Sequence, residues 1–203
     1  NTDLDELDVG DLQGSLLGKG LRQSPTRPDR CQQRTSRRDL ISRPSVGDPV
    51  AYDFREIAPA RSSPSMFLTD GEYDPVAHHN SHRAVGVPGT VAGLYLAWSE
   101  HGTAPWSRLV APAVRLARDG FPVSEPLARS LAAVLPSLAP YPASLSKFSK
   151  DGRPYGVGET WQQPDLARTL TRVAERGPDG FYRGETAALI DQEMRAHGGL
   201  ITE

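Results

Sequence analysis

The chain has 203 residues and a mass of 22.0 kDa, which suits one domain or a piece of one. Its net charge of −2 gives no strong steering towards an acidic or a basic partner. The single cysteine, Cys31, excludes an intrachain disulfide, and the sequence contains neither a signal peptide nor an apolar run long enough to span a membrane.

Residues 1–50 combine an acidic start with an arginine-rich tract interrupted by prolines. Because this segment has few large apolar side chains, it cannot offset the entropy of ordering, and we expect it to be disordered. Clustered arginines could form a nucleic-acid arm, but solvated charge is the more common role, so no nucleic-acid partner is predicted. The interpretation that we favour for the origin of this segment is a shifted reading frame or a misassembled coding sequence, in which case another frame of the same DNA would restore a glycine-rich motif.

Residues 51–203 show the patterns of a folded, mostly helical domain. The segment 50–54 is the best strand candidate. Residues 89–101 carry apolar side chains at helical spacing and predict a buried helix, with Gly102 as a left-handed cap.

Further helices are predicted along the rest of the chain, separated by prolines and glycines. They run from Pro105 to Gly120 with a possible kink at Pro112, from the N-cap Ser124 to Pro136, from Pro164 to Gly177, and from about Glu185 to Gly198. The stretch 136–158 is rich in proline, serine and glycine, and we expect it to be a long loop.

The motif with the clearest chemistry is Asp53-Phe54-Arg55-Glu56-Ile57-Ala58-Pro59-Ala60. Arginine offers a rigid fork of donors that fits a carboxylate, so Arg55 is a candidate clamp for a small acid. The alternative is a structural ion pair with Glu56 or Asp53.

Other polar groupings favour structural roles. His78, His79 and His82 suggest a metal site, but they lie in a polar loop without matching downstream ligands, so no metal is predicted. Three glycines could suggest a phosphate-binding loop, namely Gly86, Gly89 and Gly93. Their spacing does not match that motif, and they better suit a turn and close helix packing. No acid/base pair is expected among Glu159, Asp165 and Glu185, and Asp165 suits the first turn of a helix.

Several motifs, in order, resemble the large subunit of gamma-glutamyltranspeptidases. Besides the Arg55 motif they are 84–93 (AVGVPGTVAG), 116–124 (LARDGFPVS), 163–167 (QPDLA), 181–184 (FYRG) and 198–202 (GGLIT). The resemblance covers about three quarters of the chain. Because the chain opens on Asn1 and stops at Glu203, directly after the last motif, we expect it to be a fragment.

The resemblance implies an α+β fold, a partial αββα sandwich of the N-terminal-nucleophile hydrolases, of which this chain would hold mostly helices. It implies transfer of the gamma-glutamyl group of glutathione, or of other gamma-glutamyl compounds, to water or an amino acid. Arg55 would bind the substrate's α-carboxylate, and no metal or other cofactor would be needed. The nucleophile would be the first threonine of a small subunit cut from the same precursor, so we expect no catalytic residue in this chain and no activity from it alone.

By the same resemblance, the location would be periplasmic, secreted or at the cell surface. Two alternatives stay open. One is a non-catalytic helical binding protein derived from the same scaffold. The other is a related acylase that acts on beta-lactam side chains or other gamma-glutamyl amides.

Overall fold

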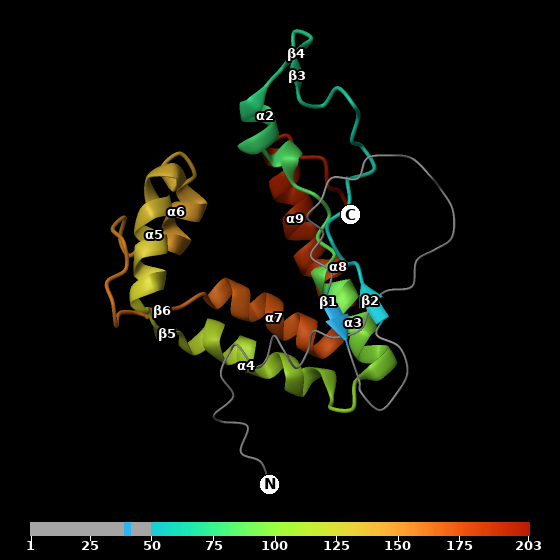
Figure 1. The fold of residues 1–203 in the computed structure, drawn as a ribbon, viewed down its shortest axis with the longest axis vertical. Helices are drawn as coiled ribbons and strands as arrows, with labels where there is room; N and C mark the ends of the chain where they lie inside the picture. The colour runs from blue at the N-terminus through green and yellow to red at the C-terminus, as the bar shows by residue number, and fades with distance from the viewer. Residues whose placement is uncertain (1–38, 42–49) are drawn as a thin grey trace. The chain divides into compact units, whose positions relative to one another are not determined.

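A computed structural model describes residues 39–41 and 50–203, which are mostly helical (Figure 1). The strands are β1 (Asp39–Ile41), β2 (Val50–Tyr52), β3 (Leu68–Thr69), β4 (Glu72–Tyr73), β5 (Phe121–Pro122) and β6 (Thr160–Trp161). The helices are α2 (Pro75–His79), η2 (His82–Ala84, a 3₁₀ turn), α3 (Thr90–His101), α4 (Trp106–Asp119), α5 (Glu125–Leu138), α6 (Pro142–Phe148), α7 (Pro164–Arg176), α8 (Asp179–Tyr182) and α9 (Gly184–Ala196).

The described strands form three small antiparallel pairs, β1 with β2, β3 with β4 and β5 with β6. The chain separates into two compact units. One holds the described residues up to Trp106 together with 176–203, and the other holds residues 107–175. No helix in the described part of the chain is long and apolar enough to cross a membrane.

The buried side chains of the first unit come from β2, α3, α9 and the residues close to them in the chain. Tyr52 is almost completely buried, and its hydroxyl donates a hydrogen bond of 2.6 Å to Glu100 at the end of α3. Burial next to this carboxylate raises the pKa of Tyr52. Ala97 and Met194 are also buried, so α3 and α9 contribute small and flexible side chains to this core.

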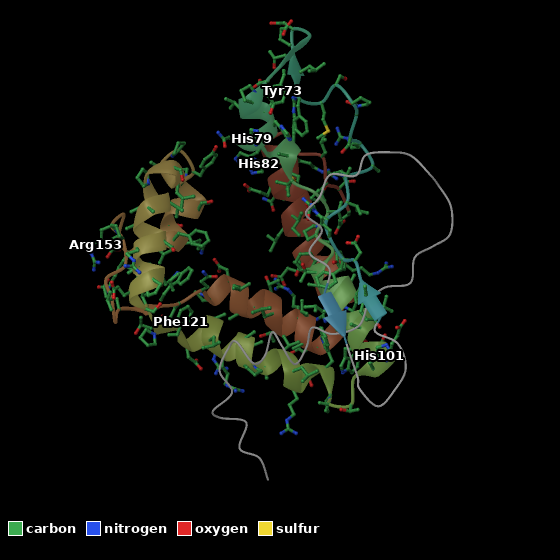
Figure 2. The ribbon with its side chains drawn as sticks, viewed as in Figure 1. Tyr73, His79, His82, His101, Phe121 and Arg153 are labelled. Atoms are coloured by element: carbon green, nitrogen blue, oxygen red, sulfur yellow. The ribbon has the colours of Figure 1, made fainter. Side chains whose placement is uncertain are left out.

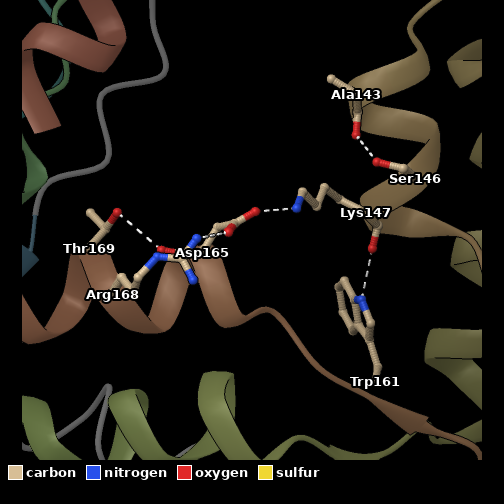
Figure 3. Close-up of polar contacts among 7 residues, drawn as sticks. All are labelled: Ala143, Ser146, Lys147, Trp161, Asp165, Arg168 and Thr169. Carbon is tan, nitrogen blue, oxygen red and sulfur yellow. Dashed lines mark hydrogen bonds and ion pairs between the residues drawn. The ribbon is translucent and has the colours of Figure 1, made fainter.

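The core of the second unit forms around α4, α5 and α7. Its buried apolar side chains are Ala117, Val123, Leu131, Ala167 and Val173. An aromatic cluster lies beside it, where the Trp161 ring packs against Phe121 and Phe148 with centroids 5.8 Å apart in both pairs. The Trp161 indole donates to the carbonyl of Lys147, which joins β6 to α6 (Figure 3).

The predicted helices are confirmed within a few residues, and so is the strand at Val50–Tyr52. Two expectations about where helices occur were wrong. Pro136 lies inside α5, which continues to Leu138, because a proline this close to the C-terminal end disturbs only the last turn of the helix. The stretch 136–158 contains α6, which begins at Pro142, where the missing N–H has no helical partner to lose.

Gly102 differs from its predicted role. It has φ −70° and ψ 139°, an extended conformation rather than a left-handed cap. A β-carbon at this position would lie 2.6 Å from Nε1 of Trp98. Glycine is therefore required here by the close approach of the Trp98 ring.

The expectation of disorder in residues 1–50 falls almost wholly outside the described residues. Residues 39–41 are the described part that bears on it, and they form β1, whose partner is β2. Cys31 and most of the arginine-rich tract also lie outside the described residues.

Candidate functional site

The segment that carries Arg55 lies directly against the glycine-containing segment 86–93. Ile57 and Val87 exchange two backbone hydrogen bonds, with N···O distances of 3.3 and 2.8 Å. A β-carbon at Gly89 would lie 3.0 Å from the carbonyl oxygen of Arg55 and closer still to that of Phe54. The backbones therefore approach each other more closely than any residue but glycine permits, which confirms the predicted packing role of these glycines.

Two further glycines extend this contact. A β-carbon at Gly86 would lie 2.7 Å from Cγ of Glu56, and one at Gly93 would lie 2.7 Å from Cδ1 of Phe54. Gly93 is in the first turns of α3, so the Phe54 ring packs on the helix backbone itself. The residues on both sides of Arg55 are thus held by backbone contacts.

Tyr182 supports the same segment from α8. Its hydroxyl donates to the carbonyl of Pro88 at 2.7 Å and lies 3.3 Å from the backbone nitrogen of Ala92, which donates to it. Burial raises the pKa of Tyr182, so its hydroxyl stays protonated and keeps its donor role. In the sequence, Tyr182 stands out only as part of a motif, because a hydroxyl that binds a segment about ninety residues away leaves no local pattern.

The side chain of Arg55 is half exposed and accessible to a ligand. Its Nε donates to Oε1 of Glu56 at 2.8 Å, and its backbone N–H donates to Oδ1 of Asp53 at 3.2 Å. The guanidinium lowers the pKa of Glu56 through that hydrogen bond. The pair is solvent-exposed, so it contributes little to stability.

A separate cavity of about 500 Å³ lies in the same unit, and Arg55 is not among the residues that line it. Its lining includes three arginines, Arg61, Arg83 and Arg195, together with Gly198 and Gly199 of the closing motif. Arg195 is paired with Asp191 at 2.8 Å. The cavity is therefore lined by positively charged side chains and is open to solvent.

The structure divides the three candidate histidines between two clusters, and Figure 2 labels His79 and His82, one from each. His78 and His79 lie on α2 with rings 4.4 Å apart, and both contact the hydroxyl of Tyr73, at 2.6 and 3.2 Å. His82 begins η2 and instead contacts Glu193 on α9.

His82, Glu193 and His197 form the second cluster. The ligand atoms of the three side chains all lie within 4.8 Å of one another. No downstream ligand was predicted for these histidines, so Glu193 and His197 were absent from the predicted candidates. Their i, i+4 spacing just before Gly198 was the signal that could have pointed to them.

Glu159, Asp165 and Glu185 were not expected to form an acid/base pair, and two of them form ion pairs. Asp165 accepts from Lys147 and Arg168, and chiefly the Lys147 ammonium lowers its pKa (Figure 3). Glu159 accepts from Arg153, from Lys150 and from the backbone of Gly156, and the Arg153 guanidinium contributes most to holding its pKa far below the usual range.

Glu185 lies in the first turn of α9, where a carboxylate interacts favourably with the helix dipole. Each of the three acids lies on a different segment of the chain. None of the described contacts pairs two of them.

Comparison with known proteins places this geometry in a family. The family model described as gamma-glutamyltranspeptidase matches residues 40–203. A curated relative, the glutathione hydrolase proenzyme of Escherichia coli (strain K12), is 45% identical over 169 residues, which cover 81% of this chain and 29% of that protein. The chain therefore spans about three tenths of the length of that relative.

Solved structures give the same match. The gamma-glutamyltranspeptidase of Helicobacter pylori has a TM-score of 0.79 and 36% identity, covering 82% of this chain and 48% of that chain. The cephalosporin acylase of Bacillus halodurans has a TM-score of 0.60 and 29% identity, covering 73% of this chain and 29% of that chain. The described residues thus match part of each of these structures.

Proposed function

The chain belongs to the gamma-glutamyltranspeptidase family, and we propose that it is the part of a glutathione hydrolase or gamma-glutamyltransferase that holds the substrate through Arg55. The α-carboxylate of the gamma-glutamyl group would accept hydrogen bonds from the guanidinium. The observation that carries the proposal is the rigid placement of the Arg55 backbone against Gly89, with a half-exposed guanidinium beyond it. A clamp of this kind needs a fixed backbone and a side chain that a ligand can reach, and the half-exposed side chain of Arg55 supports this role.

The chemistry itself would come from a part of the complete protein outside this chain. A threonine hydroxyl becomes a useful nucleophile when an adjacent base accepts its proton, and a newly exposed N-terminal amine can be that base. In this scheme the hydroxyl attacks the gamma-amide carbon, the amine of the leaving group takes a proton, and water or an amino acid later receives the gamma-glutamyl group. The four-layer sandwich would be completed by the same remaining part.

Arg55→Lys in the complete protein tests the substrate role. Lysine keeps the charge but loses the planar fork, so we expect KM for glutathione to rise by about 10- to 100-fold, the equivalent of a charged hydrogen bond of about 1.5–3 kcal/mol. The value of kcat should change much less, because the clamp acts on ground state and transition state alike.

Arg118→Lys is the matched control for that experiment. Arg118 also forms an ion pair with the next residue, Asp119, at 2.7 Å. The exposed fractions of these two side chains are similar to those of Arg55 and Glu56. An unchanged KM in Arg55→Lys, or an equal rise in both variants, would contradict the proposal.

A second candidate function is that of an acylase that acts on beta-lactam side chains. The similarity to the cephalosporin acylase of Bacillus halodurans supports this candidate. The two candidates differ in the donor. A gamma-glutamyltransferase releases cysteinylglycine from glutathione, whereas an acylase would release the free beta-lactam nucleus from an acylated cephalosporin.

We also propose a periplasmic, secreted or cell-surface location for the complete protein, which cell fractionation would test.

A further inference from the structure

We propose that His82, Glu193 and His197 form a binding site for a divalent transition-metal ion such as Zn²⁺. The inference rests on the geometry of this cluster and is independent of the proposed gamma-glutamyl chemistry. Imidazole nitrogen and carboxylate oxygen are the donor types that zinc binds in proteins. Two histidines and one glutamate would occupy three positions and leave at least one for water.

The separations of the donor atoms fit a coordination sphere. Oε1 of Glu193 lies 3.2 Å from Nε2 of His82 and 3.2 Å from Nδ1 of His197. Bonds of about 2.0–2.2 Å place two neighbouring ligands of an octahedral or a tetrahedral ion about 2.8–3.6 Å apart. Both glutamate–histidine edges therefore already have the required length.

The third edge, between the two histidines, needs only side-chain adjustment. The two rings lie with centroids 4.7 Å apart and an angle of 15° between their planes. The His197 and Glu193 side chains are more than half exposed, so they can rotate towards a shared ion without disturbing the core. The His82 side chain is 29% exposed and is the more fixed partner.

The fold brings these ligands together through the closing glycines. Gly198 has φ +71°, and the backbone N–H of Gly199 donates to the carbonyl of Met194 at 2.7 Å, which ends α9 in a Schellman-type turn. A β-carbon at Gly199 would lie 3.2 Å from Cβ of His82. The turn that ends α9 thus packs directly against His82, and His197 lies at the same helix end.

Two arginines lie close to the cluster in sequence. Arg83 follows His82, and Arg195 lies between Glu193 and His197 but is paired with Asp191. Glu193 supplies the negative charge of the cluster. An ion here would tie the start of η2 to the end of α9, and η2 leads directly into the segment that holds the Arg55 loop.

The test is titration of the full 203-residue chain with Zn²⁺ alone, in competition with a chelating dye. We expect one tight site whose affinity falls at least about tenfold in Glu193→Gln and in His197→Asn. These two exposed positions can change without opening the core, and far-UV circular dichroism checks that the helices remain. Affinity should also fall on acidification, because imidazole must lose its proton to bind the metal.

The matched control is the double variant His78→Ala/His79→Ala, which removes two stacked histidines from α2 and leaves the proposed ligands intact. It should bind Zn²⁺ as the unaltered chain does. The proposal is overturned if the chain binds no Zn²⁺, if Glu193→Gln and His197→Asn bind as tightly as the unaltered chain, or if binding is lost only in the double variant.

Discussion

Gly89→Ala should displace the Arg55 loop. The added β-carbon would lie 3.0 Å from the carbonyl carbon of Phe54 and 3.0 Å from the carbonyl oxygen of Arg55, with the Phe54 oxygen closer still. Carbon–oxygen contacts in proteins are about 3.3–3.6 Å, so one backbone must move by about an ångström to clear the Phe54 oxygen. No side-chain rotation can relieve a clash with backbone atoms.

The expected cost follows from overpacking, at about 1–3 kcal/mol. The destabilisation should mainly weaken the two backbone hydrogen bonds between Ile57 and Val87, because these bonds join the displaced segments. Hydrogen exchange of these two amides measures that local opening, and the rates should rise by about 5- to 150-fold. In the complete protein, KM for the gamma-glutamyl donor should rise as well.

Gly156→Ala is the control for Gly89→Ala. Its nearest neighbour would be Oε2 of Glu159 at 3.4 Å, an ordinary contact, and its backbone has no positive φ. Exchange of the Ile57 and Val87 amides should not change in this variant. Unchanged exchange in Gly89→Ala would refute the inference that the glycine holds the loop.

Three further predictions concern single hydrogen bonds and pH. Tyr182→Phe should cost about 1 kcal/mol in denaturant unfolding, because the Pro88 carbonyl loses its donor; an unchanged midpoint would contradict this. Tyr52→Phe should cost a similar amount, about 1 kcal/mol, through the lost bond to Glu100, and the same unfolding assay would detect it. The carboxylate of Glu159 has a depressed pKa, so its stabilising pairs are complete above the ordinary glutamate pKa and are lost as pH falls towards the lowered value. Glu159→Gln should therefore reduce the acid sensitivity of the second unit, and an unaltered pH profile of unfolding would argue against it.

The helices were predictable because their signals are local. Ser124 accepts from the Leu127 N–H as an N-cap, and Pro164 begins α7 where the sequence placed it. The packing role of Gly89 also followed from the sequence, since the spacing excluded a phosphate cradle. Arg55 was identified as a candidate from its motif, but its substrate role is still a prediction.

The rest depends on contacts between distant segments. Tyr182 supports the Pro88 segment from far along the chain, and His82 meets His197 only because the turn at Gly199 packs on it. No local pattern encodes such pairs. The role of Gly102 was wrongly predicted for the same reason, since the approach of the Trp98 ring, rather than the backbone angle, requires glycine there.

The most direct test of the central claim compares two donors in the complete protein, with and without Arg55. One donor is glutathione, and the other is its analogue in which the α-carboxylate of the gamma-glutamyl group is converted to an amide. If Arg55 binds that carboxylate, the unaltered protein should prefer glutathione by about 10-fold or more in kcat/KM, and Arg55→Ala should lose most of that preference. A preference that persists undiminished in Arg55→Ala would show that another group binds the carboxylate.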